Sequence, residues 1–292
     1  MNILIIYAHP EPTSFNAAMK NIAIHTLAAH GHNVTISDLY TMGWNAVAGP
    51  GDISGPRADS TRFSLAREQT VAMETGSIAA EIAAEQAKLA AADLLILQFP
   101  IWWFGMPAIL KGWADRVFAR GFAYLPGRKY DTGMFKGKRA LLAATTGTSA
   151  DTYAPDGIDG DILAVLWPIH NGLLRYTGFN VLPPYVAYMP GREDDATRAG
   201  QLEAYRQRLL SLDQTEPLFF HTSEDYGPDE RVKPGIVART AVQRNVCGRT
   251  VRLAGGSIGA GGCSTALHCA AGRCRRTGDQ DRAAGGRNRP PL

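Results

Sequence analysis

Three stretches of this chain have the residue types and spacing to bind a ligand and act on it. Residues 9–16 (HPEPTSFN) combine an imidazole with hydroxyl and amide side chains. Residues 102–104 are three consecutive aromatics (WWF), placed between Pro100 and Pro107. Residues 145–149 (TTGTS) are small and polar around a glycine. Together these stretches offer hydrogen-bonding groups and a flat apolar surface.

The aromatic stretch has two interpretations. Large aromatic side chains usually lie in a protein core, so residues 102–104 could fill the interior beneath a neighbouring element. In a loop they could instead form a flat wall against a flat ligand. Residues 94–99 (LLILQF) have the apolar character of a buried strand, and Pro107 suits the first turn of a following helix. The position of this loop in the fold decides between the two interpretations.

The elements that must position these loops alternate between strand and helix. Short apolar runs predict strands, whereas apolar residues at helical spacing and Ala/Glu/Lys-rich segments predict helices. We expect strands at 2–7, 34–38, 94–99, 139–145 and 181–188, the last interrupted by Pro183 and Pro184. Helices are expected at 14–30, 78–92, 107–119, 160–176 and 194–211, and a long loop or insertion at 41–67.

This alternation predicts an α/β protein with a doubly wound, five-stranded parallel sheet and helices on both faces. In such sheets ligands bind at the carboxyl ends of the strands, where the winding reverses direction. The loops 8–16, 98–107 and 145–153 follow the first, third and fourth strands, so they should converge at that edge. Their convergence favours the ligand-wall interpretation of residues 102–104.

Charge and composition change abruptly near residue 232. Residues 1–231 hold 19 Lys and Arg against 25 Asp and Glu, whereas residues 232–292 hold 11 against 2. The second part has 11 glycines and ten arginines without a sustained apolar period, which is typical of disorder. We therefore expect one folded domain over 1–231 and a basic, disordered tail over 232–292. The mildly acidic body offers no basic face for nucleic acid.

The sequence also bears on metal binding and location. All four cysteines lie in the tail, without the paired C-x2-C spacing of a zinc site, so we expect free thiols and no metal. No apolar run reaches the roughly 20 residues that span a membrane. The start MNILIIYAHPEP lacks the basic residues and cleavage site of a secretion signal. We expect a cytoplasmic protein without a membrane span.

A flavin suits the three loops best. The first loop precedes a helix, whose backbone N–H groups and dipole favour a phosphate, although helix capping by Thr13 or Ser14 would explain the same residues. Neither Gly-x-Gly-x-x-Gly nor the Walker lysine motif follows the first strand, which argues against a tightly held nicotinamide dinucleotide or a nucleoside triphosphatase. An isoalloxazine ring needs an aromatic wall and backbone donors, which residues 102–104 and the loop around Gly147 can supply.

The same residues resemble the FAD-dependent NAD(P)H:quinone oxidoreductases. The resemblance rests on residues 9, 13–16 and 19–20, on QFPIWWFGMPAILKGWADRVF, and on residues 145–147 and 160–168, and it extends from residue 3 to about residue 220. It implies a flavodoxin-like homodimer whose sites are formed by both subunits and hold FAD, with NAD(P)H and quinone bound in turn. It does not cover the tail, where the family's end segment helps to close the substrate pocket.

The resemblance also implies roles for individual residues. The FAD pyrophosphate and adenine side would be held by His9, Thr13, Ser14, Phe15 and Asn16. The flavin would contact Pro100, Ile101, Trp102, Trp103, Phe104, Thr145, Thr146, Gly147 and Tyr153. The substrate would border Trp103, Phe104, Tyr124 and Gly147, and Arg198 matches an arginine near the adenosine end of FAD.

The resemblance departs from the family at the charge relay. There, a tyrosine and a histidine six residues apart support the negative charge that hydride transfer leaves on the reduced flavin. Tyr153 matches the tyrosine, but Asp159 stands in the place of the histidine. An ionised carboxylate only accepts hydrogen bonds. Asp159 could be protonated, could only position Tyr153, could belong to a dispensable relay, or could cap the helix predicted from Gly160.

The sequence thus predicts two-electron reduction of quinones by NAD(P)H through tightly bound FAD, with ping-pong kinetics. An FMN-dependent azo or nitro reductase of the same fold is the alternative enzyme. A flavin-binding electron carrier without turnover is the alternative class, although the mild charge of the body and the extra length of 41–77 argue against it. The sequence does not distinguish NADH from NADPH or identify the quinone.

Overall fold

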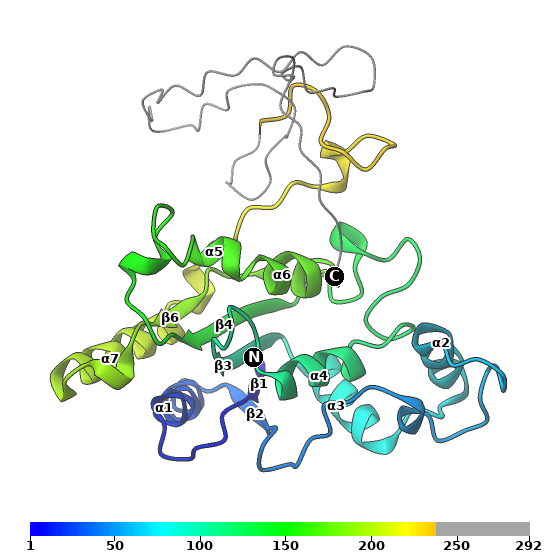
Figure 1. Ribbon diagram of the computed structural model, residues 1–292, viewed down its shortest axis with the longest axis horizontal. Coiled ribbons are helices and arrows are strands. Elements are labelled where there is room, and N and C mark those ends of the chain that lie inside the picture. The colour runs from blue at the N-terminus through cyan, green and yellow to red at the C-terminus, as the bar shows by residue number, and fades with distance from the viewer. Residues whose placement is uncertain (238–292) are drawn as a thin grey trace, which may run out of the picture. The chain divides into compact units, whose positions relative to one another are not determined.

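A parallel sheet forms the centre of the computed structural model, which describes residues 1–237 (Figure 1). The strands are β1 (Asn2–Tyr7), β2 (Asn33–Asp38), β3 (Leu94–Pro100), β4 (Arg139–Thr145), β5 (Asn180–Val181) and β6 (Tyr185–Ala187). Their order is β2-β1-β3-β4-β5, with β6 also paired to β4. Every pair is parallel. The predicted α/β fold is confirmed.

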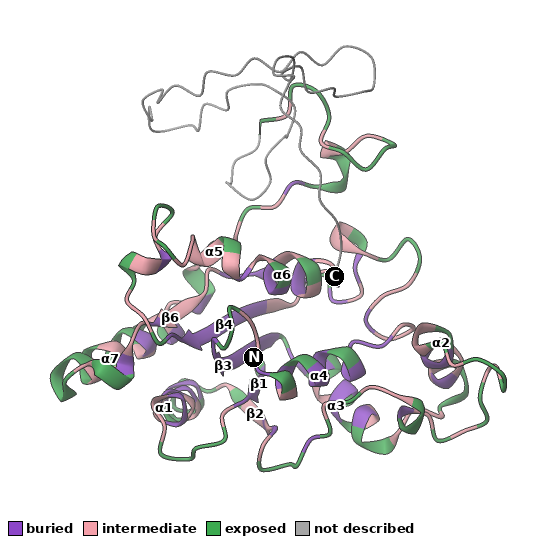
Figure 2. Cartoon of the chain, viewed as in Figure 1, coloured by how far each residue is buried: buried purple, intermediate pink, exposed green. Residues whose placement is uncertain are grey.

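Helices cover both faces of this sheet. They are α1 (Phe15–Ala29), α2 (Leu65–Thr75), α3 (Ala80–Ala91), α4 (Ala108–Val117), α5 (Ile162–Val165), α6 (Trp167–Ile169) and α7 (Asp195–Leu210). Successive strand residues point to opposite faces. Ile3 and Ile5 pack in one core cluster with residues of α1 and α7, while Leu4 and Ile6 pack in another with residues of α3 and α4. Burial on both faces explains the continuous apolar strands (Figure 2).

The last predicted strand is divided in two. β5 ends at Val181 and β6 begins at Tyr185, and both pair with β4. Pro183 and Pro184 lie between them and have no N–H group to donate to a sheet ladder. The described sheet therefore has six strands where five were predicted.

The helix predicted over 160–176 is also interrupted. α5 ends at Val165, Pro168 lies within α6, and His170–Arg175 form a π-helix. Proline cannot donate to the preceding turn, which accounts for the break. His170 is buried in the π-helix, and burial lowers its pKa to about 4. Its Nε2 has no hydrogen-bond partner among the described residues.

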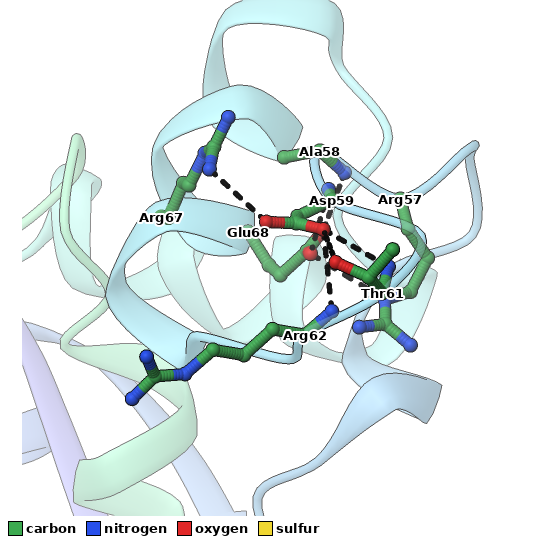
Figure 3. Close-up of polar contacts among 7 residues, drawn as sticks. All are labelled: Arg57, Ala58, Asp59, Thr61, Arg62, Arg67 and Glu68. Carbon is green, nitrogen blue, oxygen red and sulfur yellow. Dashed lines mark hydrogen bonds and ion pairs between the residues drawn. The ribbon is translucent and has the colours of Figure 1, made fainter.

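α2 is a helix that the sequence did not predict, since it starts at the end of the loop expected over 41–67. It buries Glu68 and Gln69, which weakens its apolar periodicity. The Glu68 carboxylate accepts the N–H of Ala58 at 2.8 Å, and Asp59 accepts the N–H and the hydroxyl of Thr61 at 2.9 and 2.7 Å (Figure 3). The Glu68 carboxylate therefore fastens the end of the loop to α2, whereas Asp59 holds the loop itself in shape.

A buried arginine ties the earlier part of that loop to α4. Arg116 donates from Nε to Asp52 Oδ1 and from Nη1 to the carbonyl oxygen of Asn45, both at 2.8 Å. Its Nη2 pairs with Glu81, and the guanidinium lies 4.8 Å from the ring centre of Trp44. Arg116 and Asp52 are each only 2% exposed. We call these five residues the Arg116 brace.

Most of the predicted tail lies outside the described residues, which end at residue 237. Its predicted disorder and the domain boundary near residue 231 stay predictions. Within residues 1–237, no helix has both the length and the apolar character needed to cross a bilayer.

Candidate active site

The three candidate loops meet at the carboxyl edge of β1, β3 and β4. Asn16 Nδ2 donates to Thr145 Oγ1 at 2.8 Å, which joins the first loop to the third. The N–H of Ile101 donates to the carbonyl oxygen of Thr145 at 2.8 Å, which joins the second loop to the third. The rings of His9 and Trp102 lie 6.3 Å apart. The three loops therefore converge as the strand order predicts.

Residues 102–105 form a strained turn, which we call the aromatic turn. Trp102 and Gly105 exchange two backbone hydrogen bonds of 3.1 Å, and the φ angles of Trp103 and Phe104 between them are 49° and 59°. Left-handed backbone at both central positions usually requires Asn and Gly, and a non-glycine residue there costs about 1–3 kcal/mol. Trp103 is 98% exposed and Phe104 50% exposed. These two rings do not fill a core, so the turn presents them outward.

Within residues 1–237, a buried polar layer at the same strand edge has two acceptor atoms without hydrogen-bond partners. Gln98 Nε2 donates to the carbonyl oxygen of Asn16 at 2.5 Å. Asn16 Oδ1 and Gln98 Oε1 are buried and have no hydrogen-bond partner among the described residues. An unpaired buried acceptor costs about 1–3 kcal/mol, so this edge suits a ligand with hydroxyl donors. Gln98 was not a predicted site residue. Its polar side chain within the apolar strand LLILQF was the feature that could have indicated it.

The first turn of α1 offers donors to an anion. Ser14 Oγ accepts the N–H of Ala17 at 3.1 Å, so Ser14 rather than Thr13 caps the helix. Within residues 1–237, the N–H groups of Phe15 and Asn16 have no acceptor. Free N–H groups and the helix dipole together favour a phosphate at this position.

His9 and Thr13 lie on the outer side of the first loop, where both contact Glu11. His9 Nδ1 accepts the N–H of Glu11 at 3.0 Å, and the Thr13 hydroxyl donates to the Glu11 carboxylate at 2.7 Å. Burial lowers the pKa of His9. The imidazole is therefore neutral at neutral pH and can donate one hydrogen bond.

The third loop carries a chain of hydroxyl groups. Thr148 donates to Asp159 Oδ2 at 2.8 Å, and Thr152 donates to Thr148 Oγ1 at 3.0 Å. Tyr153 is buried, with its ring edge-to-face against Phe104 at 6.3 Å. Burial raises the pKa of Tyr153, the charge of Asp159 raises it further, and a hydrogen bond with Thr148 lowers it. Thr148 was not among the predicted site residues, although it lies in the small polar run 145–149.

One interpretation of the sequence predicted that Asp159 caps the following helix. That prediction is wrong. The cap of α5 is Asp161, whose carboxylate accepts the N–H of Leu163 at 2.8 Å. Asp159 instead accepts the hydroxyl of Thr148, which an ionised carboxylate does without being protonated. This contact fits a role in positioning Tyr153.

The remaining predicted residues fall into two groups. Pro100, Thr145 and Thr146 are buried at the strand ends, with Gly147 exposed beside them. The ring of Tyr124 packs on Tyr176 at 5.9 Å, and Arg198 bonds the carbonyl oxygen of Glu193 and the carboxylate of Asp195. Within the described part of the chain, neither Tyr124 nor Arg198 has a hydrogen bond, ion pair or ring contact with the three loops.

Residues 1–209 match the family model of the flavodoxin-like fold, which gives the class of protein. Over 240 residues the chain is 43% identical to NAD(P)H dehydrogenase (quinone) 1 of Rattus norvegicus, covering 82% of this chain and 87% of the relative. Over 217 residues it is 43% identical to ribosyldihydronicotinamide dehydrogenase (quinone) of Homo sapiens, covering 74% and 94%. The chain belongs to this quinone oxidoreductase family.

A solved structure supports the same assignment. A candidate quinone reductase from Klebsiella pneumoniae superposes with a TM-score of 0.77 at 44% identity, covering 80% of this chain and 94% of that chain. The fold and the sequence comparisons therefore lead to one family of oxidoreductases.

Proposed function

We propose that this protein reduces quinones by two electrons, with NAD(P)H as the electron donor and a bound flavin as the carrier. The observation that carries the proposal is the meeting of the aromatic turn, the polar third loop and the open start of α1 at one sheet edge. The names of the relatives support the donor and acceptor. A bound flavin would accept a hydride from NAD(P)H and pass it to the quinone.

The described residues fit a flavin. The free N–H groups of Phe15 and Asn16 suit its phosphate. The N–H groups of Gly147 and Thr148 also have no acceptor within residues 1–237, and they suit the polar edge of the ring. The unpaired amide oxygens of Asn16 and Gln98 suit the hydroxyls of the ribityl chain. The aromatic turn supplies a flat surface beside these groups.

The chain can also supply a proton. Reduction of a quinone to a hydroquinone consumes one hydride and one proton. The hydroxyl group of Tyr153 belongs to a side chain packed against Phe104 of the aromatic turn. Its raised pKa keeps this hydroxyl protonated at neutral pH. We therefore assign Tyr153 as the proton donor to the quinone oxygen.

We assign FAD rather than FMN because the first loop, residues 8–16, is long and polar enough to hold a pyrophosphate and an adenosine half. Heat denaturation of the purified protein should release the flavin, and its fluorescence should rise after phosphodiesterase treatment, because adenine quenches the flavin of intact FAD. Unchanged fluorescence would identify FMN. That result would favour the azo or nitro reductase of the same fold.

We also propose a homodimer in the cytoplasm. The exposed ring of Trp103 is suited to burial against a second copy of the chain. In such a dimer, Tyr124 would contribute to the site of the other subunit. Sedimentation velocity should give twice the chain mass of 31.5 kDa. A fully active monomer would contradict this part of the proposal.

Anaerobic mixing tests the reaction itself. One equivalent of NADH or NADPH should bleach the flavin absorbance, and one equivalent of a benzoquinone should restore it. Double-reciprocal plots of rate against NADH concentration, at several fixed benzoquinone concentrations, should give parallel lines, because the two substrates occupy one site in turn. A flavin that neither cofactor bleaches contradicts the proposed function. Intersecting lines contradict the shared site.

A further inference from the structure

Arg120 has a partly buried guanidinium that lacks a partner within residues 1–237. In that part of the chain, the arginine side chains that make no hydrogen bond, ion pair or cation–π contact are those of Arg62, Arg120, Arg192 and Arg231. The other three are exposed, whereas Arg120 is partly buried. Withdrawing a charged group from water without a partner is unfavourable. The position of Arg120 therefore indicates an acceptor beyond the described residues of its own chain.

The backbone holds Arg120 beside Tyr124. The N–H of Arg120 donates to Gln69 Oε1 of α2 at 3.1 Å, and the N–H of Gly121 donates to the carbonyl oxygen of Tyr124 at 3.0 Å. Arg120 and Tyr124 are paired in an isolated β-bridge. Bridged backbones lie about 5 Å apart, which is less than the length of an arginine side chain. A guanidinium at position 120 can therefore reach the substrate that Tyr124 would border.

The third loop carries only negative charge. Residues 140–174 contain four aspartates, at positions 151, 156, 159 and 161, and no Lys or Arg. None of these carboxylates forms an ion pair with another described residue. Asp159 Oδ2 accepts the hydroxyl of Thr148, whereas Oδ1 accepts no hydrogen bond within residues 1–237. The N–H of Asp159 donates to the carbonyl oxygen of Thr152 at 2.8 Å, which holds this carboxylate next to the turn that carries Tyr153.

The segment between α4 and β4 carries the complementary charge. Residues 120–139 hold six Lys and Arg against one Asp, although residues 1–231 as a whole are acidic. Four of the six cations have partners in the same chain, namely Arg128, Lys129, Lys138 and Arg139. Arg120 and Lys136 remain, and Lys136 is exposed. This complementarity favours contact between residues 120–139 of one copy and the third loop of another.

We propose that Arg120 of one copy pairs with Asp159 of the other copy at the substrate site of the homodimer. This inference rests on the proposed function, in which Tyr124 contributes to the site of the other subunit. In a dimer with twofold symmetry the contact occurs twice, once at each site. The guanidinium neutralises the carboxylate that stands where the family has a histidine. Arg120 therefore determines specificity, because the neutral pair gives the site no net charge toward a quinone.

Removal of one charge should change the choice of substrate in a direction that depends on which charge is lost. We take the ratio of kcat/KM for a sulfonated benzoquinone to that for the uncharged benzoquinone. Arg120→Gln should lower this ratio by about fivefold, and Asp159→Asn should raise it by about fivefold. Lys136→Gln, which removes an exposed cation of the same segment, should leave the ratio unchanged. A ratio that moves equally in Arg120→Gln and Lys136→Gln contradicts the assignment.

Charge reversal tests whether the two side chains act as a pair. Arg120→Asp and Asp159→Arg each bring like charges together, so each should speed the exchange of subunits between unlabelled and ¹⁵N-labelled copies by about tenfold or more. Native mass spectrometry measures this exchange. The combined reversal restores an attractive pair and should return the rate to within about threefold of the wild type. Lys136→Asp should also stay within about threefold. Single effects that multiply in the combined variant contradict the pair.

A cross-link locates the contact directly. A carbodiimide joins an amine to a carboxylate that it touches, so Arg120→Lys, which keeps the charge, should form an amide with Asp159. In dimers of mixed unlabelled and ¹⁵N-labelled copies, the joined peptides should carry both labels, because they come from different copies. Lys136 of the same protein should not join Asp159. Absence of the doubly labelled peptide from a dimer that reduces benzoquinone contradicts the pair alone, whereas a monomeric or inactive wild type contradicts the proposed function.

Discussion

The aromatic turn leads into α4, and Arg116 of the brace lies near the end of that helix, yet the two regions place their side chains in opposite environments. The turn exposes apolar rings on a left-handed backbone, whereas the brace buries a charged group whose donors are paired. The turn costs conformational energy. The brace holds α4 against residues 44–52. The Arg116 brace therefore stabilises this part of the fold, whereas the aromatic turn does not.

Direct backbone contact strengthens this interpretation. A Cβ atom added to Gly112 in α4 would lie 2.1 Å from the carbonyl oxygen of Ala46. No side chain fits at position 112 without a shift of the backbone, so α4 lies in direct backbone contact with Ala46. A firmly held α4 can fix the exit of the aromatic turn and so maintain its strained backbone.

Removing the charge from the brace should have the largest effect on stability. Arg116→Met leaves Asp52 buried without its partner, and we expect a loss of about 3–5 kcal/mol in the free energy of unfolding. The control is Arg206→Met, whose partner Glu203 is at the surface, with an expected loss below about 1 kcal/mol. Urea unfolding measures both. Equal losses would show that the brace adds nothing beyond a surface ion pair.

His170 is a third case, a buried polar group whose Nε2 has no hydrogen-bond partner within residues 1–237. Its folded pKa of about 4 lies below the unfolded value of about 6.5, so the unfolded state binds more protons between these values. Stability should fall as the pH drops from 6.5 to 4, by roughly 3 kcal/mol in total. His170→Leu should abolish this loss, and the exposed control His25→Gln should retain it. Urea unfolding at pH 7 and pH 5 provides the test, and equal pH slopes in both variants would contradict the prediction.

Substitution of Trp103 in the aromatic turn should reduce activity with little effect on stability. Trp103→Gly removes an exposed ring and relieves a φ of 49°, so the free energy of unfolding should change by less than about 1 kcal/mol. The value of kcat/KM for benzoquinone should fall by about tenfold. Trp103→Ala loses the same ring but keeps the backbone strain. If Ala is as stable as Gly, the turn stores no strain.

The smallest effect is expected at Asp59, in the loop before α2. Hydrogen bonds from the Thr61 hydroxyl and from backbone N–H groups lower the pKa of Asp59 from 3.8 to about 2. The carboxylate therefore stabilises the fold above about pH 4, and this contribution disappears as the pH falls through 2. Asp59→Asn should slightly lower the melting temperature at pH 7 and have less effect as the pH approaches 2. Glu74→Gln, at an exposed position of α2, should leave the melting temperature unchanged at both pH values.

Much of the fold could be predicted because its apolar patterns are strong. β1, β3 and β4 read as apolar runs because both faces of the sheet are covered. α2 was missed because it buries Glu68 and Gln69, whose partners are distant loop groups and carbonyls invisible to a periodicity argument. The break at Pro168 was not predicted, because apolar residues keep their helical spacing on both sides of the proline.

The candidate site was predictable in position but not in detail. The order of the strands was enough to bring the three loops together. The left-handed backbone of Trp103 and Phe104 was not predictable, because neither is the glycine or asparagine that such a turn prefers. The link from Thr148 to Asp159 spans 11 positions and arises from the path of the loop rather than from local spacing.

The two prolines after β5 have a consequence for how the protein behaves in a crowded solution. β5 and β6 have two and three residues, and the break between them removes two amide donors from that side of the sheet. Strands this short, interrupted by proline, are poor templates for the addition of a foreign strand. β2, at the opposite side, is six residues long and uninterrupted. Resistance to aggregation is therefore built into one side of the sheet, and β2 is the side on which intermolecular strand pairing would start.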